Sequence, residues 1–201
     1  GKNIAVAGSV STYGYFIKDG LENMLPSFNE HLKILSNSGV DLIILEAMSS
    51  QSEIVEALLK CSKNINLPIW LSISCVFDKN KEIYLGYDDD IKNDKPQIYE
   101  NFKESLYKFK QIHEGPILVA HSNMSVTDEA IKILKDNYNQ IIGAYPNRGY
   151  FEKPKWKFID NIQPKDYLDK AKSWKNNGAQ IIGGCCGIGV EEIKAISILK
   201  N

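Results

Sequence analysis

The segment Ile181-Ile182-Gly183-Gly184-Cys185-Cys186-Gly187 indicates both the class of fold and the position of a candidate site. Its apolar start predicts a short buried strand, and the glycines that follow allow the backbone to turn sharply. Neighbouring cysteines form a disulfide only with strain, because the bond closes a small ring around a distorted peptide. At the end of a strand, Cys185 and Cys186 are better suited to holding a soft metal such as zinc. The alternative is a pair of small buried residues, since free cysteine is often simply buried.

Upstream of this segment, further apolar runs predict buried strands, and amphipathic stretches between them predict helices. The expected strands lie at 4–7, 41–46, 67–75, 116–121, 140–145 and 180–184. The expected helices span 27–38, 51–64, 96–113, 126–137, 164–177 and 190–199, and the polar segment 78–95 is expected to form a solvated loop or hairpin. Fully apolar strands that alternate with helices are typical of a parallel sheet covered by helices. We therefore expect an α/β fold.

Polar and cysteine residues gather where these strands are expected to end. They are Ser9, Glu46, Ser72, Ser74, His121, Asn147 and Cys185. In a (β/α)8 barrel the carboxyl ends of the strands form one catalytic face, and in an open doubly wound sheet they lie along one edge. No glycine-rich dinucleotide motif or phosphate-binding loop follows any expected strand, which disfavours a nucleotide-binding open sheet.

Composition narrows the possible functions. The chain has 201 residues, 43% of them hydrophobic, which is enough for one domain spanning 1–201. A net charge of −1 gives no electrostatic reason to expect nucleic acid or an anionic membrane as a partner. No apolar stretch approaches the roughly 20 residues of a membrane span. Four cysteines without a visible signal peptide do not predict a disulfide framework, so a reducing cytoplasm is the expected location.

A zinc site at Cys185 and Cys186 requires a further protein ligand from the end of another strand. His121, which follows Ile117-Leu118-Val119-Ala120, is the best candidate, although a histidine there could equally be a hydrogen-bonded structural residue. Cys75 ends another expected strand and is a rival ligand.

Three other residues are candidates for binding a substrate. Glu46 ends an apolar strand, and burying its carboxylate costs free energy unless a cation or several donors meet it. A substrate ammonium group would do so, and a helix cap or a lysine partner is the alternative. Tyr145 and Asn147, in a turn around Pro146, could hydrogen-bond a polar substrate or simply shape the turn.

Together, these residues resemble the homocysteine S-methyltransferase family. The Gly-Gly-Cys-Cys element at 183–186 is the family's hallmark, and the other matches run in the family's order over the whole chain. These are Gly8-Ser9-Val10-Ser11-Thr12-Tyr13-Gly14 for its Gly-Ser-x-Gly-Pro-Tyr-Gly loop, Glu46 for its Glu-Thr-x-Pro strand end, Tyr145-Pro146-Asn147 for its Tyr-Pro-Asn turn, and Trp174 for a tryptophan that precedes its last strand.

The resemblance implies a zinc-containing (β/α)8 TIM barrel. It also implies an enzyme that moves a methyl group from a sulfonium or ammonium donor to the thiol of homocysteine or a related thiol, giving methionine. Cys185 and Cys186 would be zinc ligands, and the zinc would hold the substrate thiol as a thiolate. Glu46 would bind the amino group of homocysteine. The expected partners are therefore a small-molecule thiol and a methyl donor.

The chain departs from the family pattern in its third ligand. The family draws this ligand from an Asn-Cys pair at the end of the sixth strand, where this chain reads Ala120-His121-Ser122-Asn123. Strict alignment puts Ser122 in the place of the cysteine. A shift of one residue would let His121 serve, giving a His/Cys/Cys site with an open fourth position and one negative charge fewer.

The family also has two βα units before the Gly8 loop. Six βα units cannot close an eight-stranded barrel, so we expect an incomplete barrel and an N-terminally truncated fragment. Two other functions compete with the enzyme. One is a metal-binding homologue that has lost catalysis. The other is an unrelated barrel enzyme, such as a lyase or aldolase, for which a strand-end lysine would be expected and none occurs.

Overall fold

The computed structural model describes residues 4–12, 20–87, 96–152, 155–157 and 162–200. Its centre is a sheet of six strands in the order β1-β2-β3-β7-β8-β11, in which every neighbouring pair is parallel. These strands are β1 (Ala7–Ser11), β2 (Leu42–Met48), β3 (Ile69–Ile73), β7 (Ile117–Ala120), β8 (Ile142–Tyr145) and β11 (Ala179–Ile182). Strand order follows chain order without a reversal, which is the arrangement of a (β/α) barrel and not of a doubly wound sheet. The expected α/β fold of incomplete-barrel type is confirmed, because the described strands do not close into a ring.

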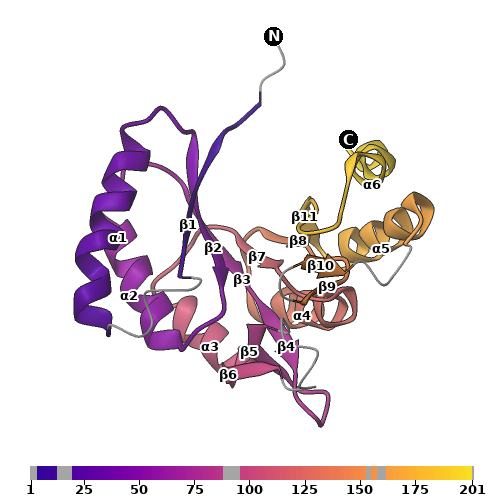
Figure 1. The fold of residues 1–201 in the computed structure, drawn as a ribbon, viewed down its shortest axis with the longest axis horizontal. Helices are drawn as coiled ribbons and strands as arrows, with labels where there is room; N and C mark the ends of the chain where they lie inside the picture. The colour runs from indigo at the N-terminus through magenta and orange to yellow at the C-terminus, as the bar shows by residue number, and fades with distance from the viewer. Residues whose placement is uncertain (1–3, 13–19, 88–95, 153–154, 158–161, 201) are drawn as a thin grey trace.

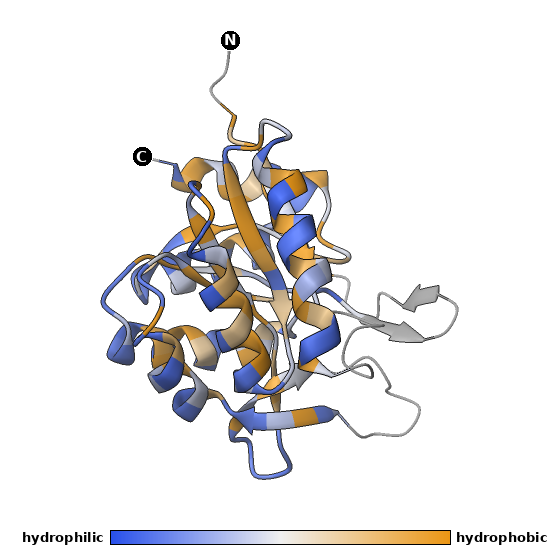
Figure 2. Cartoon of the chain, turned by 90° about the vertical axis from the view of Figure 1, so that its left-hand side faces the viewer, coloured by the Kyte–Doolittle hydropathy of each residue, from blue (hydrophilic) through white to orange (hydrophobic). Residues whose placement is uncertain are grey.

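The helices lie along one side of the curved sheet, and the strands and helices succeed one another from β1 to α6 (Figure 1). They are α1 (Leu21–Ser36), α2 (Ser52–Ser62), α3 (Phe102–Phe109), α4 (Met124–Asn137), α5 (Pro164–Asn176) and α6 (Val190–Ile196), which a 3₁₀ turn η3 (Ser197–Leu199) follows. Met24, Phe28 and Leu32 of α1 are all buried, at the spacing of one helical face. Hydrophobic and hydrophilic residues alternate along the helices in Figure 2, as this packing requires. None of the described helices has both the length and the apolar character needed to cross a membrane.

The bounds of the first strand and of the first helix differ from those expected from the sequence. The first strand, expected at 4–7, begins at Ala7 and continues through the glycine-serine segment that was expected to be a loop. Its register with β2 pairs Ala7 with Leu42 and Ser11 with Glu46, and Val10 within it is fully buried. The first helix begins at Leu21, upstream of the expected start, because Met24 shares its buried face.

A small antiparallel sheet lies between β3 and α3 in the chain, and only part of it was expected, since the polar segment 78–95 was expected to form a solvated loop or hairpin. It consists of β4 (Cys75–Phe77), β5 (Ile83–Tyr87) and β6 (Gln97–Asn101), and it lies at the lower side of the view in Figure 1. β4 and β5 pair as an antiparallel hairpin, so the hairpin alternative is confirmed, but the expected solvation is wrong for β5, whose Ile83 and Leu85 are buried. Residues 88–95 lie outside the described residues. The short hairpin of β9 (Tyr150–Glu152) and β10 (Lys155–Lys157) was likewise not expected.

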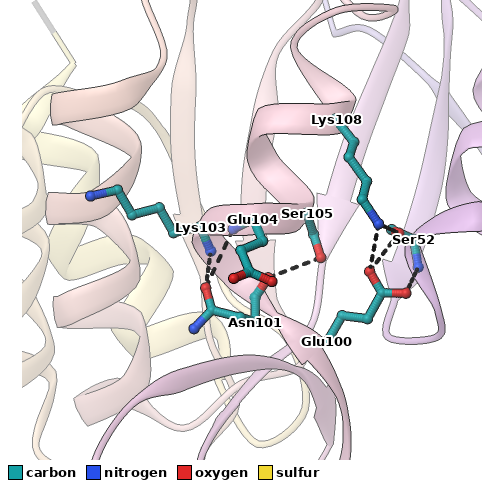
Figure 3. A network of polar contacts seen from close by, with 7 residues as sticks. All are labelled: Ser52, Glu100, Asn101, Lys103, Glu104, Ser105 and Lys108. Atoms are coloured by element: carbon teal, nitrogen blue, oxygen red, sulfur yellow. Dashed lines mark hydrogen bonds and ion pairs between the residues drawn. The ribbon is translucent and has the colours of Figure 1, made fainter.

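The helix expected over 96–113 is wrong in its first part, which forms β6. The helix α3 begins at Phe102 because Asn101 caps it: Asn101 Oδ1 accepts hydrogen bonds from the backbone of Lys103 (3.0 Å) and of Glu104 (3.3 Å), as Figure 3 shows. A side-chain acceptor that satisfies the free amide groups of the first turn fixes where a helix starts.

A polar network ties this small sheet to the first residue of α2 (Figure 3). The Glu100 carboxylate accepts hydrogen bonds from the Ser52 hydroxyl (2.5 Å) and from Lys108 Nζ (3.1 Å). Burial alone would raise the pKa of Glu100, but the hydrogen bonds from Ser52 and Lys108 outweigh it and lower the pKa below the usual value. Because Ser52 directly follows the loop after β2, the network also holds the loop that leads away from Glu46.

Candidate metal centre

The carboxyl ends of two strands bring His121, Cys185 and Cys186 together. His121 follows β7 and the two cysteines follow β11, and their potential ligand atoms all lie within 4.8 Å of one another. The two Sγ atoms are 3.9 Å apart. Two thiolates bound tetrahedrally at about 2.3 Å from zinc would be about 3.8 Å apart. The side chains present therefore fit a tetrahedral metal ion and leave a fourth position for another ligand.

Backbone hydrogen bonds and one close contact shape the cysteine turn. The bonds run from Gly183 N to Ala144 O (3.0 Å), from Cys185 N to Pro146 O (3.0 Å) and from Arg148 N to Cys186 O (2.7 Å). A Cβ atom at Gly184 would lie 2.2 Å from Ile188 Cγ2, so this position admits only glycine without a shift of the turn. These bonds attach the cysteine turn to the end of β8 and to the Tyr-Pro-Asn segment at 145–147.

The backbone at His121 is unusual. Its φ is 47°, in the left-handed region that is uncommon for residues other than glycine, although histidine is found there more often than most. Its carbonyl oxygen accepts a hydrogen bond from the Ser74 hydroxyl at 2.9 Å, which holds the residue in place. Residues kept in such conformations cluster at functional sites, because only a constraining environment maintains them.

The neighbouring Ser122 does not belong to this group. It is buried, and its hydroxyl donates to Ala120 O (2.7 Å) while accepting from Cys75 N (2.8 Å). Cys75 itself lies in the hydrophobic core, and burial raises the pKa of its thiol far above the usual value. Both Ser122 and Cys75, the two rivals of His121 at the sequence level, therefore make structural contacts instead of joining the two cysteines.

The environment of the two thiols favours a thiolate. Hydrogen bonding from Cys186, and next from His121, lowers the pKa of Cys185 well below its usual value and outweighs the opposing effect of burial. Thiolate is the form of cysteine that binds a metal. The site therefore holds its anionic donor ready at neutral pH.

A second polar cluster lies at the carboxyl ends of β2, β3 and β8. Tyr145 OH is 2.7 Å from Glu46 Oε1 and 2.5 Å from Ser72 Oγ, and Ser72 Oγ donates to the same Glu46 oxygen at 3.1 Å. Burial, and then the negative charge of Glu46, raise the pKa of Tyr145, so its hydroxyl remains protonated and can donate. Among the hydrogen bonds of the described residues, none reaches Glu46 Oε2. This oxygen is an acceptor that a cationic group could use.

Asn147 follows Tyr145 in the chain and bonds through its backbone to the residue after His121. Its backbone N–H donates to Ser122 O at 2.9 Å, next to His121. Its side chain is buried, and its Oδ1 has no hydrogen-bond partner among the described residues. Unpaired buried polar atoms are rare and call for a ligand or water. The sequence expectation named Asn147, Glu46 and Tyr145, but it gave no role to Ser72, whose only signal was a serine inside an otherwise apolar strand.

The parallel (β/α) sheet and the His/Cys/Cys group at its strand ends place this chain in the class of barrel-type proteins with a candidate metal centre. The family model for homocysteine S-methyltransferase matches residues 1–199. The chain belongs to the homocysteine S-methyltransferase family.

Individual relatives agree with this placement. The chain is 27% identical over 215 residues to homocysteine S-methyltransferase 1 of Zea mays, covering 98% of this chain and 62% of that relative. It is 26% identical to the selenocysteine methyltransferase of Astragalus bisulcatus, covering 96% of this chain and 58% of that protein. The metallated form of the homocysteine methyltransferase MmuM from Escherichia coli has a similar fold, with a TM-score of 0.67, 18% identity, and coverage of 98% of this chain and 62% of that chain. The chain thus spans about three fifths of the length of these proteins.

Proposed function

We propose that this chain binds zinc through His121, Cys185 and Cys186 and takes part in methyl transfer to the thiol of homocysteine or a related thiol, giving methionine. The observation that carries the proposal is the convergence of these ligand atoms within 4.8 Å at the strand ends. Two relatives whose names describe methyl transfer to homocysteine and to selenocysteine support the reaction class. A similar fold solved in a metallated form supports the metal.

Bound zinc would supply a Lewis acid that holds the acceptor thiol as a thiolate. The chain's own contribution is the donor set. Cys185 offers an anion at neutral pH, and neutral imidazole is a good zinc ligand. A His/Cys/Cys set carries one negative charge fewer than three cysteines. We therefore expect this site to suit a somewhat different range of thiols, donors or metals.

The polar cluster would hold the other end of the acceptor. An amino acid presents an ammonium group, and within the described part of the chain no hydrogen bond reaches Glu46 Oε2, whereas Tyr145 and Ser72 orient the other oxygen of this carboxylate. Glu46 is half-buried, and a carboxylate partly withdrawn from water is stabilised when a cation meets it. Asn147 Oδ1 offers a further acceptor beside the metal centre. A thiol amino acid would thus be held at both ends, with its sulfur near the cysteines and its amine near Glu46.

The methyl donor is a sulfonium or ammonium compound in this proposal, with S-methylmethionine, S-adenosylmethionine and betaine as the compounds to screen. A reducing compartment such as the cytoplasm would keep both thiols available. The second candidate function is a metal-binding homologue without catalysis. The absence of a cysteine at the third ligand position favours it, since His121 and Ser122 stand there.

Zinc content of the reduced protein tests the proposal. We expect about one zinc per chain in wild type and its loss in His121→Ala and Cys186→Ala. Two matched controls should keep it: Cys61→Ala, which removes a thiol from α2, and His31→Ala, which removes an exposed imidazole from α1. Zinc lost only in the cysteine variant would leave His121 structural, and no zinc in wild type would overturn the metalloenzyme proposal.

Methyl transfer separates the two candidate functions. The assay measures methionine formed from homocysteine with each donor, using the chain together with any sequence that its gene encodes upstream. Zinc uptake without product from any donor would support the catalytically inactive metal-binding homologue.

A further inference from the structure

An ion pair next to the cysteine turn is unusually well buried. Arg148 NH1 lies 3.5 Å from Glu192 Oε1, and their side chains are only 16% and 10% exposed. The other carboxylate oxygen of Glu192 accepts the backbone N–H of Gly189 at 2.9 Å. Burying a carboxylate is costly unless a cation and hydrogen bonds compensate it, so these partners determine where Glu192 lies.

Glu192 is one of the residues that attach α6 to the rest of the protein. Within this helix the buried residues are Glu192 and Ile196, whereas Val190 is 79% exposed and Ile193 is 42% exposed. Because Ile196 is at the far end of the helix, Glu192 is the buried residue of α6 nearest the cysteine turn. Ile188, just before the helix, also packs against the core.

Arg148 also contacts the cysteine turn directly. Its backbone N–H donates to the carbonyl of Cys186 at 2.7 Å, while its guanidinium pairs with Glu192. Arg148 is therefore attached to the turn at the second cysteine and, through Glu192, at Gly189 where the turn enters α6. Cys186 is itself the first of these two attachments, and Gly187 and Ile188 lie between them.

We propose that Arg148 and Glu192 are positioning residues that set the metal affinity of the cysteine turn, an inference that rests on the proposed zinc site. Neither residue contacts the metal in this proposal. The pair confines the turn to the geometry in which the two thiols and His121 converge. Groups that orient metal ligands from behind typically contribute a factor of about 10–100 to metal affinity.

Metal affinity is measured on the reduced whole chain by competition between Zn²⁺ and a chromophoric chelator. Co²⁺ spectra report on thiolate coordination in the same proteins. We expect Glu192→Ala and Arg148→Met each to weaken Zn²⁺ binding about 10–100-fold. The double variant should bind no more weakly than the weaker single variant, because both changes break one interaction. Arg148→Lys should recover part of the affinity.

The matched control is Glu191→Ala, which removes the adjacent and exposed carboxylate of the same helix and should leave Zn²⁺ affinity unchanged. Urea denaturation of each metal-free variant measures stability separately. If Glu192→Ala does not fold, Glu192→Gln replaces it, since the amide keeps an acceptor for Gly189 and removes only the charge.

The proposal is overturned if the Glu192 and Arg148 variants bind Zn²⁺ as wild type does, if the control weakens binding equally, or if the effects of the single variants multiply in the double variant. In these cases the zinc site itself stands, because wild type binds. If wild type takes up neither Zn²⁺ nor Co²⁺, this proposal and the proposed function fall together.

Discussion

Exchanging Ser122 or His121 for alanine should affect two different properties of the protein. The two residues are adjacent at the end of β7, and either could occupy the place of a third ligand in the sequence. In the structure, the His121 side chain offers its ligand atom to the cysteine pair, whereas the Ser122 hydroxyl bonds to Cys75 N and Ala120 O. We therefore expect Ser122→Ala to cost stability and His121→Ala to cost metal.

The expected loss in Ser122→Ala follows from the contacts that disappear. The Cys75 amide is buried and would lose the hydroxyl that accepts its hydrogen bond at 2.8 Å. Leaving one buried donor unpaired costs about 1–3 kcal/mol. For a chain of this size, each kcal/mol corresponds to about 2–4 °C, so a loss of about 2 kcal/mol lowers Tm by about 4–8 °C. In metal-free protein, His121→Ala should change the free energy of unfolding by less than about 1 kcal/mol.

Urea denaturation in the presence of a chelator gives the free energy of unfolding, and zinc analysis of the reduced proteins gives the metal content. We expect Ser122→Ala to be destabilised and to keep its zinc, and His121→Ala to show the converse. The reasoning would be refuted by a Ser122→Ala protein that is as stable as wild type but has lost its zinc, because the serine would then be the ligand.

Three further outcomes follow from contacts described above. Glu100→Gln should lower the free energy of unfolding by about 1 kcal/mol at neutral pH. Because the pKa of Glu100 is depressed in the folded state, the difference in stability between wild type and variant should vanish as pH falls through that pKa. Urea denaturation that shows the same difference at every pH would contradict the role of Lys108. Gly184→Ala should destabilise the metal-free protein by about 1–3 kcal/mol and weaken zinc binding, because the added Cβ would lie 2.2 Å from Ile188 Cγ2 and 2.5 Å from Ile188 Cβ. Urea denaturation and zinc analysis that both match wild type would contradict the close contact. Tyr145→Phe should raise KM for the thiol acceptor about 10-fold at unchanged zinc content, and steady-state kinetics with an unchanged KM would argue against the amine-binding cluster.

The sheet could be predicted from the sequence because its strands are apolar throughout. The strand expected at 116–121 is β7 at Ile117–Ala120, with every residue buried, and a wholly apolar run of that length is typical of a strand in a covered parallel sheet. The small sheet of β4, β5 and β6 could not be predicted in the same way. Its strands are short and partly polar, and Pro96, a residue favoured in the first turn of a helix, placed the expected helix start just before residues that pair with β5.

The candidate site could likewise be predicted only in part from the sequence. Adjacent cysteines behind two glycines, and polar residues at strand ends, are visible in the sequence and predict where chemistry gathers. The choice between His121 and Ser122 is not visible there. It depends on the backbone conformation at the end of β7, where a left-handed residue decides which of two neighbouring side chains lies with the core and which lies with the thiols.

The left-handed backbone at His121 sets folding and metal binding against each other at a single position. Glycine adopts a φ of 47° without the steric cost that any side chain with a Cβ incurs, which is about 1 kcal/mol. A laboratory selection for heat resistance alone would therefore tend to replace the imidazole with glycine, whereas a selection for metal uptake would retain it. Running both selections on one library would show which demand has kept histidine at this position.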